Sequence, residues 1–121
     1  MNRYPPPAPR ALVVALIAVV LLLVVVASAR AATPRARAAA VVCDVFGSRC
    51  SAAMRVAKCE TGGTYDRHAI GGAGERGLFQ IHPVHFGRLD ESRLFELRYN
   101  ALFAFRLSSG GRDWSAWTCR P

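Results

Sequence analysis

The N-terminal third of the chain has no acidic residue, and the stretch from Ala11 to Val26 has no polar residue at all. All eight Asp and Glu residues lie from Asp44 onward, whereas five of the 16 basic residues come earlier. The remainder has eleven basic against eight acidic residues, a mild positive balance that suits an anionic polymer and is also ordinary for a soluble domain. No basic stripe with interleaved aromatic residues is present, which argues against nucleic-acid binding.

Metal-binding patterns are also missing. No two of the four cysteines have the C-x2-C to C-x4-C spacing of structural zinc sites. His82 and His85 stand on either side of Pro83, which argues against one shared helical face, and His68 lies in a different loop. We therefore interpret the histidines as turn residues, and we predict that the protein uses neither a metal nor another cofactor.

The apolar stretch near the N-terminus predicts a targeting segment. Arg3 and Arg10 form a basic flank, residues 11–27 are apolar, and the Ala27 to Ala29 stretch has the small-x-small pattern of a signal-peptide cleavage site. The run is a few residues short of the roughly 20 that cross a membrane. We predict that residues 1–29 form a signal peptide, or otherwise an N-terminal membrane anchor. Either alternative places the remaining chain outside the cytoplasm.

The rest of the chain is long enough for one small domain. Residues 30–40 contain Pro34 among alanines and arginines without a periodic apolar face, and we interpret them as a linker. Residues 41–121 then form the folded domain, whose core is small enough to need covalent support. An exported chain can obtain that support from disulfides.

Four cysteines allow three disulfide connectivities. We favour Cys43 with Cys50 and Cys59 with Cys119, because the second bridge would tie the residue before Glu60 to the C-terminal end of the chain. On the chain-entropy model the short ring contributes roughly 2 kcal/mol and the long one roughly 4 kcal/mol.

Apolar periodicity predicts two helices, over residues 51–60 and 99–108. Residues 43–50 and 64–76 look like loops, and residues 77–81 form a short apolar segment that could be a strand or a helix start. Trp114 and Trp117 could stack on sugar rings, but their position beside a cysteine favours a place in the core.

Glu60 is the most suggestive single residue. It closes an apolar helix, and Gly62 and Gly63 end that helix directly afterwards. The negative end of the helix dipole and an apolar surround both disfavour a carboxylate, so the pKa of Glu60 should be raised, as a general acid requires.

Four sequence blocks carry a family resemblance: CETGG at 59–63, GLFQI at 77–81, YNA at 99–101 and GRDWSAW at 111–117. In order and spacing they resemble the superfamily of soluble lytic transglycosylases and goose-type lysozymes. The resemblance is nearest to small secreted actinobacterial and phage members, and extends to the resuscitation-promoting factors. It implies a mostly α-helical, lysozyme-like single domain stapled by two disulfides.

The resemblance also implies roles for individual residues. Glu60 matches the catalytic acid that cleaves the bond between N-acetylmuramic acid and N-acetylglucosamine in peptidoglycan. Phe79 and Gln80 belong to a block that lines the cleft, and Tyr99 and Asn100 match a pair that faces it. Three of these residues also have a purely structural interpretation. Gln80 could be a half-buried amide with its hydrogen bonds satisfied inside the protein, and Tyr99 and Asn100 could be residues at the start of a helix.

Two departures from the family pattern are Thr61, where a serine is usual, and Leu97–Arg98, where an Asp-Pro pair is often found.

Two carboxylates normally take part in glycoside hydrolysis, and the second is not obvious in this sequence. Glu75 and Asp66 are the candidates, although Glu75 could simply pair with Arg76. Lytic transglycosylases manage with one glutamate, so we favour a transglycosylase that acts on glycan strands as a monomer. The alternatives are a hydrolytic muramidase and a non-catalytic wall-binding relative. A membrane-active cationic effector is disfavoured because neither predicted helix is basic and amphipathic.

Overall fold

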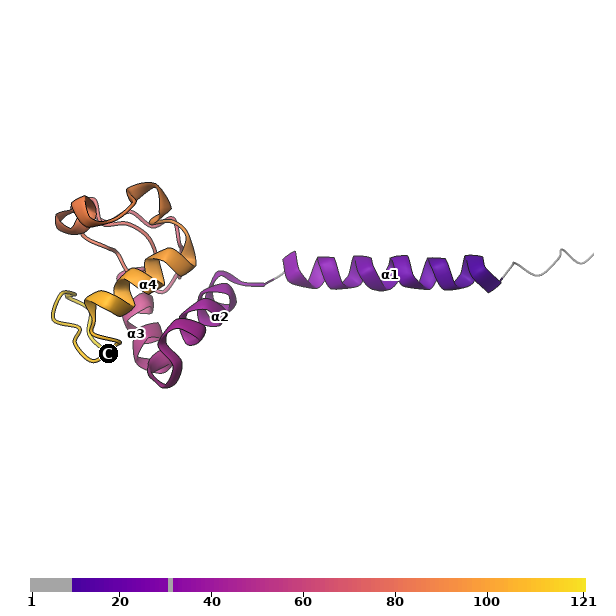
Figure 1. The fold of residues 1–121 in the computed structure, drawn as a ribbon, viewed down its shortest axis with the longest axis horizontal. Coiled ribbons are helices and arrows are strands. Elements are labelled where there is room, and N and C mark those ends of the chain that lie inside the picture. Colours follow the sequence, from indigo (N-terminus) through magenta and orange to yellow (C-terminus); the bar gives the residue numbers. More distant parts are fainter. Residues whose placement is uncertain (1–9, 31) are drawn as a thin grey trace, which may run out of the picture. The chain divides into compact units, whose positions relative to one another are not determined.

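The computed structural model describes residues 10–30 and 32–121, with side chains over 12–22 and from 32 onward. The chain divides into two units, Met1–Ala32 and Thr33–Pro121. The first contains helix α1, Arg10–Arg30 (Figure 1), whose side chains over residues 12–22 are exposed. Over the part of the chain described in this way, no helix is long and apolar enough to cross a membrane. Residues 1–9 of the expected targeting segment lie outside the described residues.

The second unit begins with a helix where the sequence predicts a linker. Helix α2 spans Pro34–Phe46, so most of the expected linker and the expected loop before Cys50 are helical. Thr33 caps the helix by accepting the Ala36 N–H at 3.1 Å, and Pro34 occupies the first turn, where its missing N–H costs nothing. Residues 30–40 taken alone show only alanines on the buried side of this helix, because the larger apolar residues of the buried face, Val42 and Phe46, come after them.

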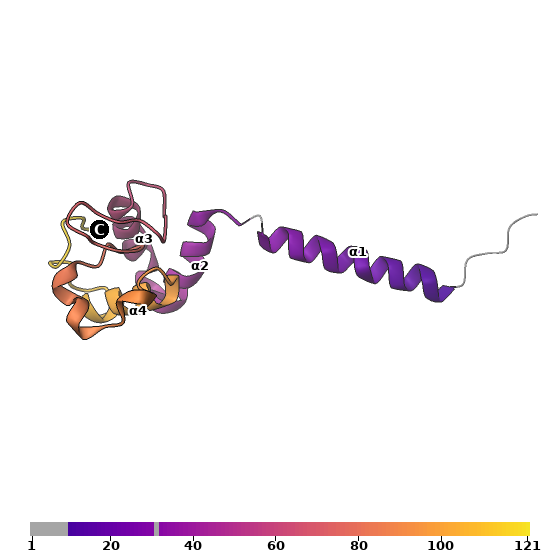
Figure 2. The same ribbon diagram turned by 90° about the horizontal axis from the view of Figure 1, so that it is seen from above.

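Helix α2 belongs to the core of the unit. Its buried residues Ala38, Val42 and Phe46 recur at intervals of four, and the helix packs against both α3 and α4 (Figures 1 and 2). Arg35 and Arg37 therefore belong to the folded unit, which carries thirteen basic against eight acidic residues.

Helices α3, Cys50–Glu60, and α4, Leu97–Leu107, confirm the two predicted helices to within two residues. A short 3-10 turn, Gly47–Arg49, joins α2 to α3, and two further 3-10 helices, Pro83–Arg88 and Glu91–Arg93, precede α4. Both predicted disulfides are present, Cys43–Cys50 at the junction of α2 and α3 and Cys59–Cys119 across a separation of 60 residues.

The GLFQI block is a tight turn and not a strand or a helix start. Arg76 and Ile81 exchange backbone hydrogen bonds of 3.1 and 3.0 Å across it, and a second bridge joins Ile70 to Arg76. The buried side chain of Asn100, on α4, stabilises the turn by hydrogen bonds to its backbone. Its amide donates to the carbonyls of Arg76 at 3.0 Å and Leu94 at 2.9 Å, and its oxygen accepts the Phe79 N–H at 2.8 Å.

Aromatic side chains fill the centre of the unit. Trp114 lies 5.7 Å from Phe46, 6.1 Å from Phe79 and 5.0 Å from Trp117, measured between ring centroids. Trp117 donates its indole N–H to the Phe79 carbonyl at 2.7 Å. Both tryptophans are buried, so the interpretation of these indoles as core residues is confirmed.

We predict that Asn100→Ala destabilises the protein by about 3 kcal/mol, because it leaves one buried N–H and two carbonyls without their partners. Urea unfolding would measure the loss. Arg106→Ala, at an exposed position on the same helix, should change stability by less than about 0.5 kcal/mol. Equal stability of the two variants would contradict the role given to Asn100.

Candidate active site

The loop after α3 fixes the position of Glu60. Thr61 donates its hydroxyl to the Ala57 carbonyl at 2.7 Å and accepts the Tyr65 N–H at 2.9 Å. The next two residues, Gly62 and Gly63, have φ values of 58° and 88°, a region that glycine adopts readily. The serine-to-threonine departure from the family pattern therefore keeps the hydroxyl that closes the helix end.

The Glu60 carboxylate is half-buried against the C-terminal end of the chain. Its Oε1 accepts the backbone N–H of Cys119 at 3.3 Å, and Cys119 is held there by its disulfide to Cys59. Burial raises the pKa of Glu60 above its ordinary value. The Cys119 N–H opposes that rise, and the negative charge of Glu75 adds to it. The direction agrees with the sequence prediction.

Glu75 faces the same region from the loop after residue 70. Its Oε2 accepts the Ala73 N–H at 3.0 Å, and its carbonyl accepts the Gly71 N–H at 2.8 Å. A Cβ on Gly71 would collide with the Glu75 carboxylate and lie 2.6 Å from Gln80 Oε1. Gly71 therefore leaves room for Glu75 and Gln80 to lie side by side.

Gln80 has an uncommon backbone conformation, and only part of its side chain is hydrogen-bonded within the protein. Its φ of 46° lies in the left-handed region, which is uncommon for a residue with a side chain. Its amide nitrogen donates to the carbonyls of Gly77 at 2.8 Å and Ala69 at 3.1 Å, so both amide hydrogens are used. Only the oxygen is left to meet a ligand. The structure thus places Gln80 beside Glu75, whose charge in turn acts on Glu60.

Phe79 and Asn100 do not join this group. The Phe79 side chain is fully buried in the aromatic core, and Asn100 is 1% exposed with all its polar atoms bonded to backbone. Contrary to the prediction of cleft contacts, both residues support the GLFQI turn from inside. Neighbouring residues in a tight turn point in different directions, so Gln80 can reach the surface while Phe79 cannot.

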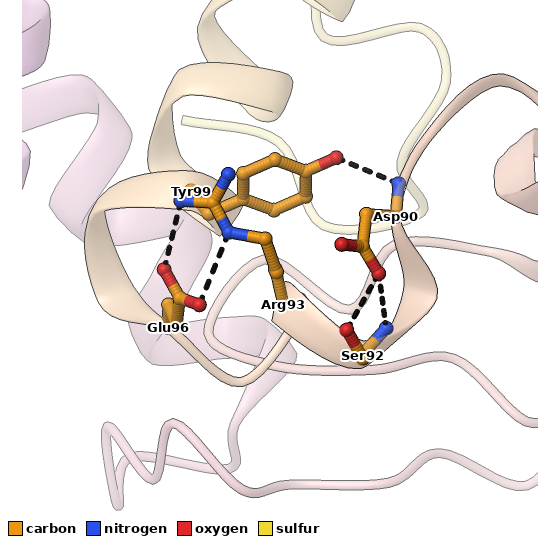
Figure 3. Close-up of polar contacts among 5 residues, drawn as sticks. All are labelled: Asp90, Ser92, Arg93, Glu96 and Tyr99. Carbon is orange, nitrogen blue, oxygen red and sulfur yellow. Dashed lines mark hydrogen bonds and ion pairs between the residues drawn. The ribbon is translucent and has the colours of Figure 1, made fainter.

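Tyr99 lies in a different polar cluster (Figure 3). Its hydroxyl oxygen accepts the Asp90 N–H at 2.8 Å, and the Arg93 guanidinium lies 4.4 Å from its ring centroid. Arg93 in turn donates two hydrogen bonds, of 3.1 and 3.0 Å, to Glu96. None of the described polar contacts joins Tyr99 to the Glu60 group, so a substrate role for Tyr99 stays a prediction.

A comparison with protein families matches residues 34–119 to the model described as "Lysozyme like domain". The chain belongs to this family. No curated protein and no solved structure matches the chain. At the level of the family, membership indicates a glycosidase or transglycosylase directed at peptidoglycan. Two disulfides in a cell-wall family also point to a location outside the cytoplasm.

In this lysozyme-like domain the other carboxylate candidate, Asp66, is not among the groups that shift the pKa of Glu60. Asp66 accepts the His68 N–H at 2.8 Å and lines a hollow of about 470 Å³ together with Arg37 and Arg67. Glu60 does not line that hollow, and Glu75 is the carboxylate whose charge acts on Glu60. The charge that acts on Glu60 therefore favours Glu75 over Asp66 as its partner.

The histidines have structural surroundings. His82 accepts the Val84 N–H at 3.2 Å through Nδ1 and so caps the 3-10 helix that follows, while the His85 ring lies 5.8 Å from that of Phe103. Within the described residues, no three His, Cys, Asp or Glu side chains are grouped to hold a metal ion.

The backbone N–H of Cys119 was not predicted as a partner of Glu60. Its signal was nevertheless available, since a disulfide partner of Cys59 must bring its backbone within about 7 Å of the residue before Glu60. Gly71 was missed as well, and a lone glycine in a glycine-rich loop gives no such signal.

We predict that Cys59→Ser/Cys119→Ser lowers stability by about 4 kcal/mol and changes the pKa of Glu60, because the C-terminal segment that lies against the carboxylate and donates the Cys119 N–H to it is no longer held in place. Urea unfolding and carboxyl NMR titration would measure the two effects. Cys43→Ser/Cys50→Ser removes a disulfide without touching Glu60, and should leave that pKa as it is. The same Glu60 pKa in both double variants would rule out the proposed coupling.

We also predict that Glu75→Gln lowers the pKa of Glu60, because it removes a nearby negative charge that favours the protonated acid. The same NMR titration would detect the shift. Asp44→Asn removes an exposed charge that pairs with Arg98 and serves as the control. An unshifted Glu60 in the Glu75 variant would mean that the two carboxylates do not interact.

Proposed function

We propose that this lysozyme-like domain cleaves the β-1,4 bond between N-acetylmuramic acid and N-acetylglucosamine, with Glu60 as the general acid. The observation that supports this most directly is the half-buried Glu60 carboxylate, whose raised pKa favours the protonated form that a leaving oxygen needs. The carboxylate is also held in place by the Cys119 N–H, so its orientation is set before substrate binds.

The reaction that fits one fixed carboxylate is lytic transglycosylation. Glu60 gives its proton to the glycosidic oxygen, which leaves with the N-acetylglucosamine side of the strand. The ionised Glu60 then takes the proton of the muramyl 6-hydroxyl as that oxygen bonds to C1 of the same sugar. The product is a 1,6-anhydro sugar, Glu60 is protonated again, and no water is consumed.

Gln80 is suited to a binding role beside Glu60. Because its amide hydrogens are bonded to backbone carbonyls, its free oxygen can only accept a hydrogen bond. We infer that it accepts one from a sugar hydroxyl or an N-acetyl N–H. Tyr99 is proposed to bind the glycan farther along.

Hydrolysis is the second candidate, because the charge of Glu75 acts on Glu60. A carboxylate at that position could activate a water or stabilise positive charge on the sugar ring. We propose that the enzyme works as a monomer outside the cytoplasm and needs no cofactor in either case. Residues 1–29 would direct its export.

Product analysis tests the proposal. The oxidised protein is incubated with purified peptidoglycan, and the soluble products are identified by mass spectrometry. We expect muropeptides with 1,6-anhydro ends, released at least about 100-fold more slowly by Glu60→Gln. Glu91→Gln, at an exposed position, is the matched control and should release them at the normal rate.

The chemical form of the sugar ends in the released products distinguishes transglycosylation from hydrolysis. Reducing ends, lost in Glu75→Gln, would establish a hydrolase and make Glu75 the second carboxylate. Absence of release by the folded, oxidised protein would reject both and favour a wall-binding role.

A further inference from the structure

A second hollow, of about 780 Å³, lies between the start of α2 and one face of α3. We call it the basic groove, because Arg35, Arg55 and Lys58 line it and no acidic residue does. Ala39, Met54 and Tyr65, which are buried or half-buried, give it an apolar floor. The groove therefore offers both positive charge and apolar surface.

The three cations are available to a ligand. The ion pairs among the described residues use other arginines, namely Arg76, Arg93 and Arg98. Arg55 donates one hydrogen bond to the Ser51 hydroxyl at 3.0 Å, which orients its guanidinium and leaves its other donors free. An anionic ligand would thus meet charges that no neighbouring carboxylate neutralises.

The basic groove lies on the opposite side of α3 from Glu60. Arg55 and Lys58 follow Ser51 at four and seven residues, so these three share one face of the helix. Glu60 comes two residues after Lys58, a rotation of about 200°. A ligand in the groove therefore does not occupy the space in front of Glu60.

The groove nevertheless touches the loop that holds Glu60. Gly63 and Tyr65 line the groove, and the Gly63 N–H donates to the Lys58 carbonyl at 2.7 Å. The two sites are consequently built on one helix end.

We propose that the basic groove binds the acidic stem peptide of peptidoglycan, an inference that rests on the proposed function. Arg35, Arg55 and Lys58 would bind its carboxylates, and the apolar floor would contact its alanine methyl groups. A phosphate polymer would match the charges but not the floor. Because the groove faces away from Glu60, it would hold a stem of a neighbouring strand while Glu60 cuts another.

Titration with a free stem tetrapeptide, Ala-γ-Glu-diaminopimelate-Ala, tests this directly. Backbone amide NMR on the oxidised protein should show shifts at residues of the groove, with binding that weakens as salt is added. Arg55→Gln/Lys58→Gln should weaken binding at least about tenfold. Arg106→Gln, an exposed arginine outside the groove, should bind normally.

The same titration separates this proposal from the catalytic one. Glu60→Gln should bind the tetrapeptide with unchanged affinity, whatever the outcome of the cleavage assay. Failure of the tetrapeptide to bind, or equal binding by the double variant, would overturn the groove assignment and leave catalysis by Glu60 untouched. Inorganic polyphosphate that binds as tightly and with the same dependence on Arg55 and Lys58 would also overturn it, by showing a general polyanion site.

Discussion

The disulfide between Cys59 and Cys119 is the constraint on which the rest of the site depends. It joins the residue before Glu60 to the end of the folded chain, and the backbone N–H of the same Cys119 reaches the Glu60 carboxylate. One covalent bond therefore closes a loop of about 60 residues and sets the surroundings of the proposed acid. A domain with so small a core gains stability and a placed carboxylate from the same link.

The buried side-chain amide of Asn100 supports the second part of the site, the GLFQI turn. Asn100 bonds to three backbone groups around the GLFQI turn, and Gly77 gives it room, because a Cβ there would collide with the Asn100 amide. The GLFQI turn places the Gln80 side chain beside that of Glu75. The position of the half-buried Gln80 thus follows from a residue that is itself buried.

The sequence predicted the parts of the fold that leave a strong local signal. Helices α3 and α4 have apolar stripes ended by glycines, and the favoured cysteine pairing has proved correct. Helix α2 was not predicted, because its apolar face, Ala38, Val42 and Phe46, runs across the boundary placed between linker and domain at residue 41. The Thr33–Pro34 start was nevertheless a recognisable cap.

The sequence predicted which segments belong to the candidate site better than it predicted which side chains of those segments face it. Motif matching identified the GLFQI and YNA blocks, but it could not tell which residue of each block faces outward. Phe79 and Asn100 turned out to be buried supports, while Gln80 keeps an oxygen free. That distinction depends on the path of the backbone through a turn with a residue at positive φ, which sequence spacing does not describe.

The early start of α2 has a consequence for maturation of the protein. Proteolytic processing at the predicted site after Ala29 would leave Thr33 in place, so the N-terminal cap of α2 would survive it. Processing only a few residues later would remove Thr33 and Arg35 together, and with them a helix cap and one wall of the basic groove. The short interval between Ala29 and Thr33 is therefore the stretch in which such processing would spare the cap of α2.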